Sequence, residues 1–363
     1  MLSAYITHPD CARHDMGAQH PECPQRLGAV HDQLLMRGLL DHMVPFDAPL
    51  ATHAQLARAH DALYVQELVA RSPTEGLVQV DPDTVMGPHT LQAALRAAGA
   101  AVEATDLVLS GQVSTAFCAV RPPGHHAERG AAMGFCFFNN VAVGIRHALD
   151  VHGLQRVALI DFDVHHGNGS EDIFRGDERV LMCSIYEKGL YPFNGDNAVG
   201  ANMVNVGLPT RSGSEAFREA VTQHWLPALD AFQPQLIYVS AGFDAHRDDD
   251  MGNLGLLDAD VAARHLSMKV GRVETSWTAN CLAIGLAQGF IEPLEATALH
   301  IVQATIEGFI GAYQAGSRDA FNAAIARRYD GIRDYIVAHY RLNRRSGPFW
   351  RDVAANDDLS DDL

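Results

Sequence analysis

The chain has 363 residues, of which 47% are hydrophobic and 20% are charged. This is the composition of a globular protein with a sizeable core. Lysine and arginine total 27 against 44 acidic residues, so the formal net charge is -17. Because so acidic a surface repels phosphate backbones, nucleic acid is excluded as a direct partner.

Membrane and secretory classes are also disfavoured. The N-terminal sequence MLSAYITHPD lacks the basic and apolar regions of a signal peptide. The longest uncharged stretch, residues 275–291, contains Thr, Asn, Ser and Gln, which predicts buried protein rather than a membrane span. Six cysteines without a CxxC pair predict neither a thiolate zinc site nor a disulfide framework. We therefore expect a cytoplasmic protein with no membrane partner.

In chain order, three short apolar runs predict strands, at Thr115–Val120, Val157–Val164 and Leu236–Ala241. Helical patterns lie between them, including Asn140–His152 and Ser214–Phe232. Strands that alternate with helices predict an α/β domain with a largely parallel sheet. Ligands of such domains bind at the carboxyl ends of the strands.

The composition changes after about residue 266. Of 19 histidines, 17 lie at or before His265. The later part predicts two long helices, Pro293–Tyr313 and Arg318–Asn343, and shows no clear strand pattern. The sequence therefore predicts two domains, the second of them helical.

Each predicted strand is followed by side chains that suit metal binding or acid–base chemistry. These are His125-His126, the segment DFDVHHGNG (161–169) and Asp244. Either motif alone has an ordinary explanation, because a DxDxH can cap a helix and a histidine pair can lie in a core or on the surface. Their coincidence at three strand ends favours a single catalytic site.

Alternation along a strand would place Asp161, Asp163 and His165 on one face. Two carboxylates and an imidazole form a ligand set suited to a divalent metal such as zinc. Three protein ligands leave a coordination position open for water and substrate, which is typical of a catalytic metal site.

Five segments of the first part of the chain belong together: HPECPQRL (20–27), RPPGHHA (121–127), GFCFFNN (134–140), DFDVHHGNG (161–169) and SAGFDAH (240–246). With these segments, residues 1 to about 265 resemble the histone deacetylase and acetylpolyamine amidohydrolase family, in its class II-like bacterial branch. The resemblance implies an arginase-like α/β fold with a parallel sheet flanked by helices. It also implies hydrolysis of acetyl-lysine or acetylpolyamine amides.

The resemblance implies that Asp163, His165 and Asp244 bind zinc. It makes His125 and His126 the tandem histidines, one of which takes a proton from the attacking water while both orient it. The resemblance pairs Asp161 with His125 and Asn168 with His126. It also implies a potassium site at Asp161 and Ser184. Phe135 and Tyr191 would line the tunnel that holds the acyl-lysine side chain.

A carboxylate partner keeps an imidazolium available as a general acid, and a neutral Asn partner leaves its histidine less basic.

One further catalytic group of the family is absent. Its catalytic tyrosine follows a Gly-Gly pair, and the 31 glycines of this chain include no such pair. The resemblance therefore implies impaired activity.

The part from about residue 267 onward carries a second set of motifs: Trp277, Asn280-Cys281, Ile284-Gly285-Leu286, GFIEPLEAT (289–297) and RRYDGIRDYIVAHYRLN (327–343). With these residues it resembles the C-terminal part of flavin-dependent tryptophan halogenases. The family's substrate-side glutamate would be Glu295, whose simpler interpretation is a carboxylate in the first turn of a helix. No GxGxxG is present, so no flavin is expected.

We interpret the chain as a composite. Residues 1–266 form a deacetylase-like zinc hydrolase domain that lacks its C-terminal part, and residues 267–363 form a halogenase-like helical fragment. The alternative is a divergent deacetylase whose tail merely resembles a halogenase. Three functional hypotheses follow: an impaired zinc deacetylase, a non-catalytic binder of acyl-lysine or polyamine, and a halogenase relic without function. Whether the join is natural, the choice between protein and polyamine substrates, and the oligomeric state are left open by the sequence.

Overall fold

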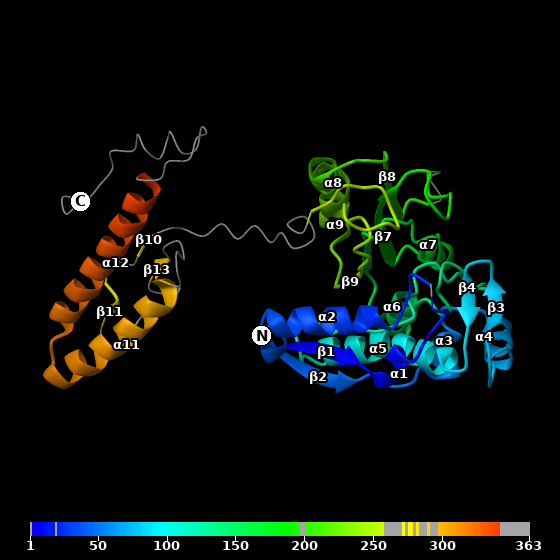
Figure 1. Cartoon of the computed structure of the whole chain (residues 1–363), viewed down its shortest axis with the longest axis horizontal. Coiled ribbons are helices and arrows are strands. Elements are labelled where there is room, and N and C mark those ends of the chain that lie inside the picture. Colours follow the sequence, from blue (N-terminus) through cyan, green and yellow to red (C-terminus); the bar gives the residue numbers. More distant parts are fainter. Residues whose placement is uncertain are drawn as a thin grey trace. The chain divides into compact units, whose positions relative to one another are not determined.

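A computed structural model describes residues 2–18, 20–196, 200–257, 271–272, 275–278, 281–282, 289–290 and 297–341 (Figure 1). The chain divides into two compact units, Met1–Ala263 and Arg264–Leu363. None of the helices in the described part is long and apolar enough to cross a membrane.

The strands of the first unit form two parallel sheets and one antiparallel pair. The sheet orders are β2-β1-β5 and β8-β7-β6-β9, and β3 pairs with β4. The expected α/β fold with parallel strands is confirmed, with its parallel strands divided between two sheets. The strands are β1 (Ser3–Thr7), β2 (Met43–Asp47), β3 (Val78–Asp81), β4 (Thr84–Met86), β5 (Thr115–Cys118), β6 (Val157–Asp161), β7 (Val180–Glu187), β8 (Met203–Leu208) and β9 (Leu236–Ser240).

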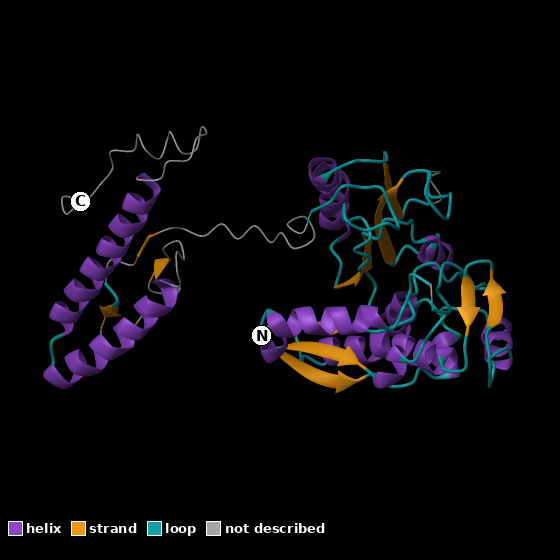
Figure 2. Ribbon diagram, viewed as in Figure 1, coloured by secondary structure: helices purple, strands orange, loops and turns teal. Residues whose placement is uncertain are grey.

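Helices cover these sheets, and Figure 2 shows long helices beside β1 and β2. Helix α5 packs against β1, β5 and α6, because its buried face is rich in alanine and permits close approach. The main core cluster joins α5, α6 and β6. The helices are α1 (Pro9–Ala12), α2 (Gln25–Met36), α3 (His53–Leu56), α4 (Ala62–Ala70), α5 (Thr90–Leu109), α6 (Asn140–Asp150), α7 (Asn168–Phe174), α8 (Ser214–Ala220) and α9 (Leu226–Phe232), with a 3-10 turn at Leu40–His42 and a π-turn at Val221–Trp225.

Strand β6 ends earlier than the apolar run predicts. It stops at Asp161, whose Oδ1 accepts a hydrogen bond from the backbone N–H of Asp163 at 3.2 Å. The Oδ1 of Asp163 accepts in turn from the N–H of His165 at 2.8 Å. These two carboxylates satisfy backbone donors that would otherwise extend the ladder, so the chain turns. The prediction that a continuous strand aligns these three residues was therefore wrong beyond Asp161.

Strand β9 lies at the edge of its sheet within the described part of the chain. Its apolar side chains Ile237 and Val239 are 49% and 54% exposed. The two side chains point to the same face of the sheet, so this strand leaves apolar surface exposed there.

The second unit contains helices α11 (Thr297–Ala315) and α12 (Arg318–Arg341). Their rings Phe309 and Phe321 pack edge-on against Trp277. The unit is not purely helical, since four two-residue strands form two antiparallel pairs: β10 (Gly271–Arg272) with β13 (Gly289–Phe290), and β11 (Trp277–Thr278) with β12 (Cys281–Leu282). Pro293 and Glu295 lie outside the described residues.

Candidate active site

The candidate site gathers residues from three chain segments that follow parallel strands. His125 and His126 follow β5, Asp163 and His165 follow β6, and Asp244 follows β9. The structure brings these five side chains together, although β5 belongs to a different sheet from β6 and β9.

Asp163, His165 and Asp244 form a compact set of metal-ligating groups, whose candidate donor atoms all lie within 4.8 Å of one another. The Nδ1 of His165 is 2.9 Å from Oδ1 of Asp163 and 3.1 Å from Oδ2 of Asp244. The other oxygen of Asp244 accepts from the N–H of Val164 at 2.9 Å, which fixes that carboxylate.

The electrostatics of this trio favour a positive charge between the carboxylates. Burial lowers the pKa of His165, but the bonds to Asp163 and Asp244 outweigh it and raise the pKa to about 10. Burial and the charge of Asp163 raise the pKa of Asp244. Two carboxylates that face one point, with side chains only 16% and 17% exposed, are relieved by a cation, so this donor set fits a divalent metal of the zinc class.

His125 is held by a carboxylate on each side. Its Nδ1 lies 3.0 Å from Oδ2 of Asp161, and its Nε2 lies 3.7 Å from Oδ2 of Asp163. Burial lowers the pKa of His125, whereas Asp163 and Asp161 raise it, and the net result is about 9. The two carboxylates therefore favour the protonated form of His125.

His126 is held by an amide instead. Its Nδ1 lies 2.7 Å from Oδ1 of Asn168, whose Nδ2 donates to Oε1 of Glu128 at 2.8 Å. Since Glu128 can only accept, it orients the Asn168 oxygen toward His126, so Nδ1 is the protonated nitrogen. Burial and the neighbouring His125 lower the pKa of His126 well below its usual value. Its Nε2 is left as a free acceptor, which is what a general base requires. Nothing in the sequence singles out Glu128.

Phe135 stands on a strained turn near the histidines. Its φ is +67°, and that of Gly134 is +56°. The β3–β4 hairpin holds this turn, because Asp83 Oδ1 accepts from the Gly134 N–H at 3.1 Å and Thr84 Oγ1 accepts from the Phe135 N–H at 3.0 Å. A Cβ on Gly134 would lie 2.4 Å from the His126 ring, so only glycine fits there. Sequence reasoning missed Asp83 and Thr84, since a short DPDT segment has no distinctive signature.

Tyr191 lies over the same histidines. Its ring is edge-on to His126 at 5.1 Å and to His165 at 6.3 Å between centroids. The structure thus places this predicted tunnel residue at the candidate site, while Phe135 makes its aromatic contact with His20 at 4.6 Å.

The predicted potassium ligands are neighbours across the sheet. Asp161 on β6 pairs with Ser184 on β7, and both are fully buried. The Ser184 hydroxyl is 3.2 Å from Nδ1 of His166. The potassium assignment stays a prediction.

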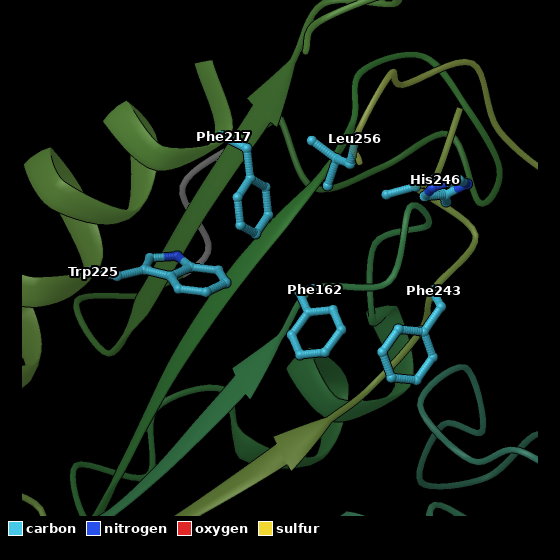
Figure 3. A pocket seen from close by; sticks show the side chains of 8 residues that line it. Phe162, Phe217, Trp225, Phe243, His246 and Leu256 are labelled. Carbon is cyan, nitrogen blue, oxygen red and sulfur yellow. The ribbon is translucent and has the colours of Figure 1, made fainter. Parts of the chain in front are cut away.

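An aromatic cavity of about 110 Å³ lies beside the segments that carry Asp163 and Asp244 (Figure 3). Phe162 separates Asp161 from Asp163, and Phe243 precedes Asp244. The Phe162 and Phe243 rings meet edge-on at 5.7 Å, and Phe217 and Trp225 also line the cavity. Aromatic packing therefore supports the segments that carry the carboxylates.

A second cluster with metal-ligand chemistry joins Asp106, His147 and His152. The Oδ1 of Asp106 lies 2.8 Å from Nε2 of His147 and 2.6 Å from Nε2 of His152. Arg58 donates to Nδ1 of His147 at 3.2 Å, so the proton of that ring sits on Nε2 and points at Asp106. This arrangement is a hydrogen-bonded link between α5 and α6, and it does not suit a metal.

Comparison with known proteins gives two family matches. Residues 20–285 match the histone deacetylase domain and residues 238–363 match tryptophan halogenase, so residues 238–285 lie in both. This agrees with the composite description of the chain.

Individual relatives support the first match. A histone deacetylase-like amidohydrolase of Pseudomonas aeruginosa is 37% identical over 262 residues, covering 70% of this chain and 67% of the relative. A polyamine deacetylase, HDAC10 of Mus musculus, is 38% identical over 281 residues, covering 70% of this chain but only 41% of the relative. The solved HDA15 HD domain superposes with a TM-score of 0.66 at 31% identity, covering 71% of this chain and 78% of that structure.

Proposed function

Because the chain belongs to the histone deacetylase family, we propose that its first unit is a zinc-dependent amide hydrolase with weak turnover. Its substrates would be acetyl-lysine or acetylpolyamine amides. The observation that carries the proposal is the convergence of Asp163, His165 and Asp244 within 4.8 Å, beside one histidine held by a carboxylate and one held by an amide.

Asp163, His165 and Asp244 would hold the zinc ion. When bound, zinc supplies Lewis-acid chemistry, which lowers the pKa of water and polarises a carbonyl. The chain's own groups divide the proton transfers. His126 accepts the proton of the attacking water at Nε2, because its other nitrogen is committed to Asn168. The protonated His125 gives its proton to the departing amine nitrogen.

The turnover would be weak because a preorganised donor to the acyl oxygen is worth about 10²–10³ in rate. The Gly-Gly-Tyr segment that supplies this donor in the family is absent from the sequence. The alternative is that the pocket shows no turnover and acts as a non-catalytic binder of acyl-lysine or polyamine. The halogenase-like tail would contribute no flavin chemistry.

The test is the zinc-to-protein ratio of the soluble, monodisperse full chain, beside an Asp163→Ala variant. A ratio near one that is lost in the variant supports the proposal. A ratio near zero in the parent overturns it. Turnover of an acetyl-lysine peptide and of acetylspermidine then separates an enzyme from a binder.

A further inference from the structure

The hydroxyl of Tyr191 is an unusual feature of the candidate site. Its oxygen is buried and makes no hydrogen bond, although its ring lies against His126 and His165. A buried hydroxyl without a partner is unfavourable, so such groups in folded proteins call for an explanation.

The nearest acceptors do not supply one. The Asp83 carboxylate is close enough to interact with the phenol, but the hydroxyl oxygen has no acceptor at normal hydrogen-bond geometry. Oδ1 of Asp83 accepts instead from the N–H of Gly134 and from the hydroxyl of Thr84. A phenol keeps its proton at neutral pH and can act as a hydrogen-bond donor.

Amide hydrolysis needs such a donor at this place. Water attack forms a bond from its oxygen to the acyl carbon, and the electron pair of the C=O bond moves onto the acyl oxygen. When the C–N bond breaks, that pair returns and the amine leaves with a proton. A donor aimed at the acyl oxygen stabilises the charge only while it exists.

We propose that the Tyr191 hydroxyl donates a hydrogen bond to the acyl oxygen of the substrate and so supplies part of the stabilisation that the absent tyrosine segment would give. This inference rests on the proposed function. Its geometric basis is an unpaired O–H on a ring that contacts both the proposed base His126 and the proposed ligand His165.

The test is Tyr191→Phe in the full chain loaded with zinc, since this change removes the hydroxyl and keeps the ring. We expect kcat for an acetyl-lysine peptide to fall by about 10²-fold, with KM and the zinc ratio within threefold of the parent. Because an unpaired buried hydroxyl is lost, thermal stability should stay equal or rise. Tyr5→Phe is the matched control: it removes the hydroxyl of another buried tyrosine, 3.5 Å from His31 Nδ1 and outside the site.

Binding provides a second readout. A peptide with a trifluoromethyl ketone in place of the acetyl amide binds as its hydrate, which resembles the tetrahedral state. Tyr191→Phe should weaken this peptide at least tenfold more than it weakens the acetyl-lysine peptide.

The possible failures are distinguishable. If kcat of Tyr191→Phe stays within threefold of the parent, the hydroxyl is only part of the wall and the inference is wrong. If the parent binds zinc and peptide but shows no turnover, the inference is wrong while the binding form of the proposed function stands. If the parent binds no zinc, both are wrong.

Discussion

A Cβ placed on Gly242 would lie 2.1 Å from Oδ2 of Asp163. Gly242 follows β9, whereas Asp163 follows β6, so the close approach of these two segments depends on a residue without a side chain. The space for the carboxylate is thus set by a neighbouring strand end and not by the metal motif itself.

We predict that Gly242→Ala displaces Asp163 and reduces the zinc ratio well below one, with folding retained. Metal analysis and circular dichroism measure the two effects. Gly28→Ala is the control, because a Cβ there meets nothing within 4 Å. Full zinc occupancy in Gly242→Ala would contradict this prediction, because the Asp163 segment would then have made room for the added Cβ without losing the metal.

A buried ion pair supports the loop before the tandem histidines. Arg121 donates to both oxygens of Glu22, each at 2.5 Å, and also donates to the carbonyls of Cys11 and His14. Both ionic side chains are at most 3% exposed. Removing one partner leaves a buried charge unpaired, so Glu22→Ala should lower the free energy of unfolding by about 3–5 kcal/mol. Urea unfolding measures this loss of free energy. The control is Lys188→Ala, which breaks the exposed ion pair with Asp196 and should lower the free energy of unfolding by under about 1 kcal/mol.

Acid should destabilise the fold through His60. Burial lowers its pKa to about 4, against 6.5 as the ordinary value. The N–H of Asn139 donates to Nε2 at 2.9 Å and the carbonyl of Glu128 faces Nδ1 at 2.9 Å, which admits only the neutral ring. Between these pH values the unfolded chain binds a proton that the folded chain does not.

Stability is therefore full above pH 6.5 and falls as the pH drops toward 4, by about 3 kcal/mol in total from this group. Urea unfolding at pH 7 and pH 4.5 should show a smaller loss in His60→Gln than in the parent. The exposed His42→Gln should behave like the parent. An equal pH dependence in His60→Gln would refute the assignment.

The open edge of β9 should limit solubility. Ile237 and Val239 expose about half of their surfaces on a strand that is at the edge of its sheet among the described strands, and exposed apolar edge strands recruit other chains. Ile237→Lys should raise the soluble, monodisperse fraction at unchanged thermal stability, as measured by light scattering and a thermal scan. Leu159→Lys places the same charge on the buried neighbour strand β6 and should prevent folding. No gain in solubility from Ile237→Lys would mean that this edge is covered in solution.

Local sequence patterns predicted much of the fold. The apolar runs at 157–164 and 236–241 contain β6 and β9, and the pattern at 214–232 contains α8, the π-turn and α9. The prediction failed at the end of β6 because the carboxylates of Asp161 and Asp163 capture backbone N–H groups, which an apolar pattern does not register. The short strands of the tail were missed because two residues are too few to show alternation.

By itself, the sequence determined the family, the two origins of the chain and the identity of the candidate metal ligands, since these depend on residue types at fixed spacing. Only the tertiary structure decided that Asp244 meets His165, that Glu128 orients Asn168 and that the Tyr191 hydroxyl is buried without a partner. These pairs lie on segments far apart in the chain or at non-periodic turns. Their distances are set by sheet register and core packing, which no local pattern encodes.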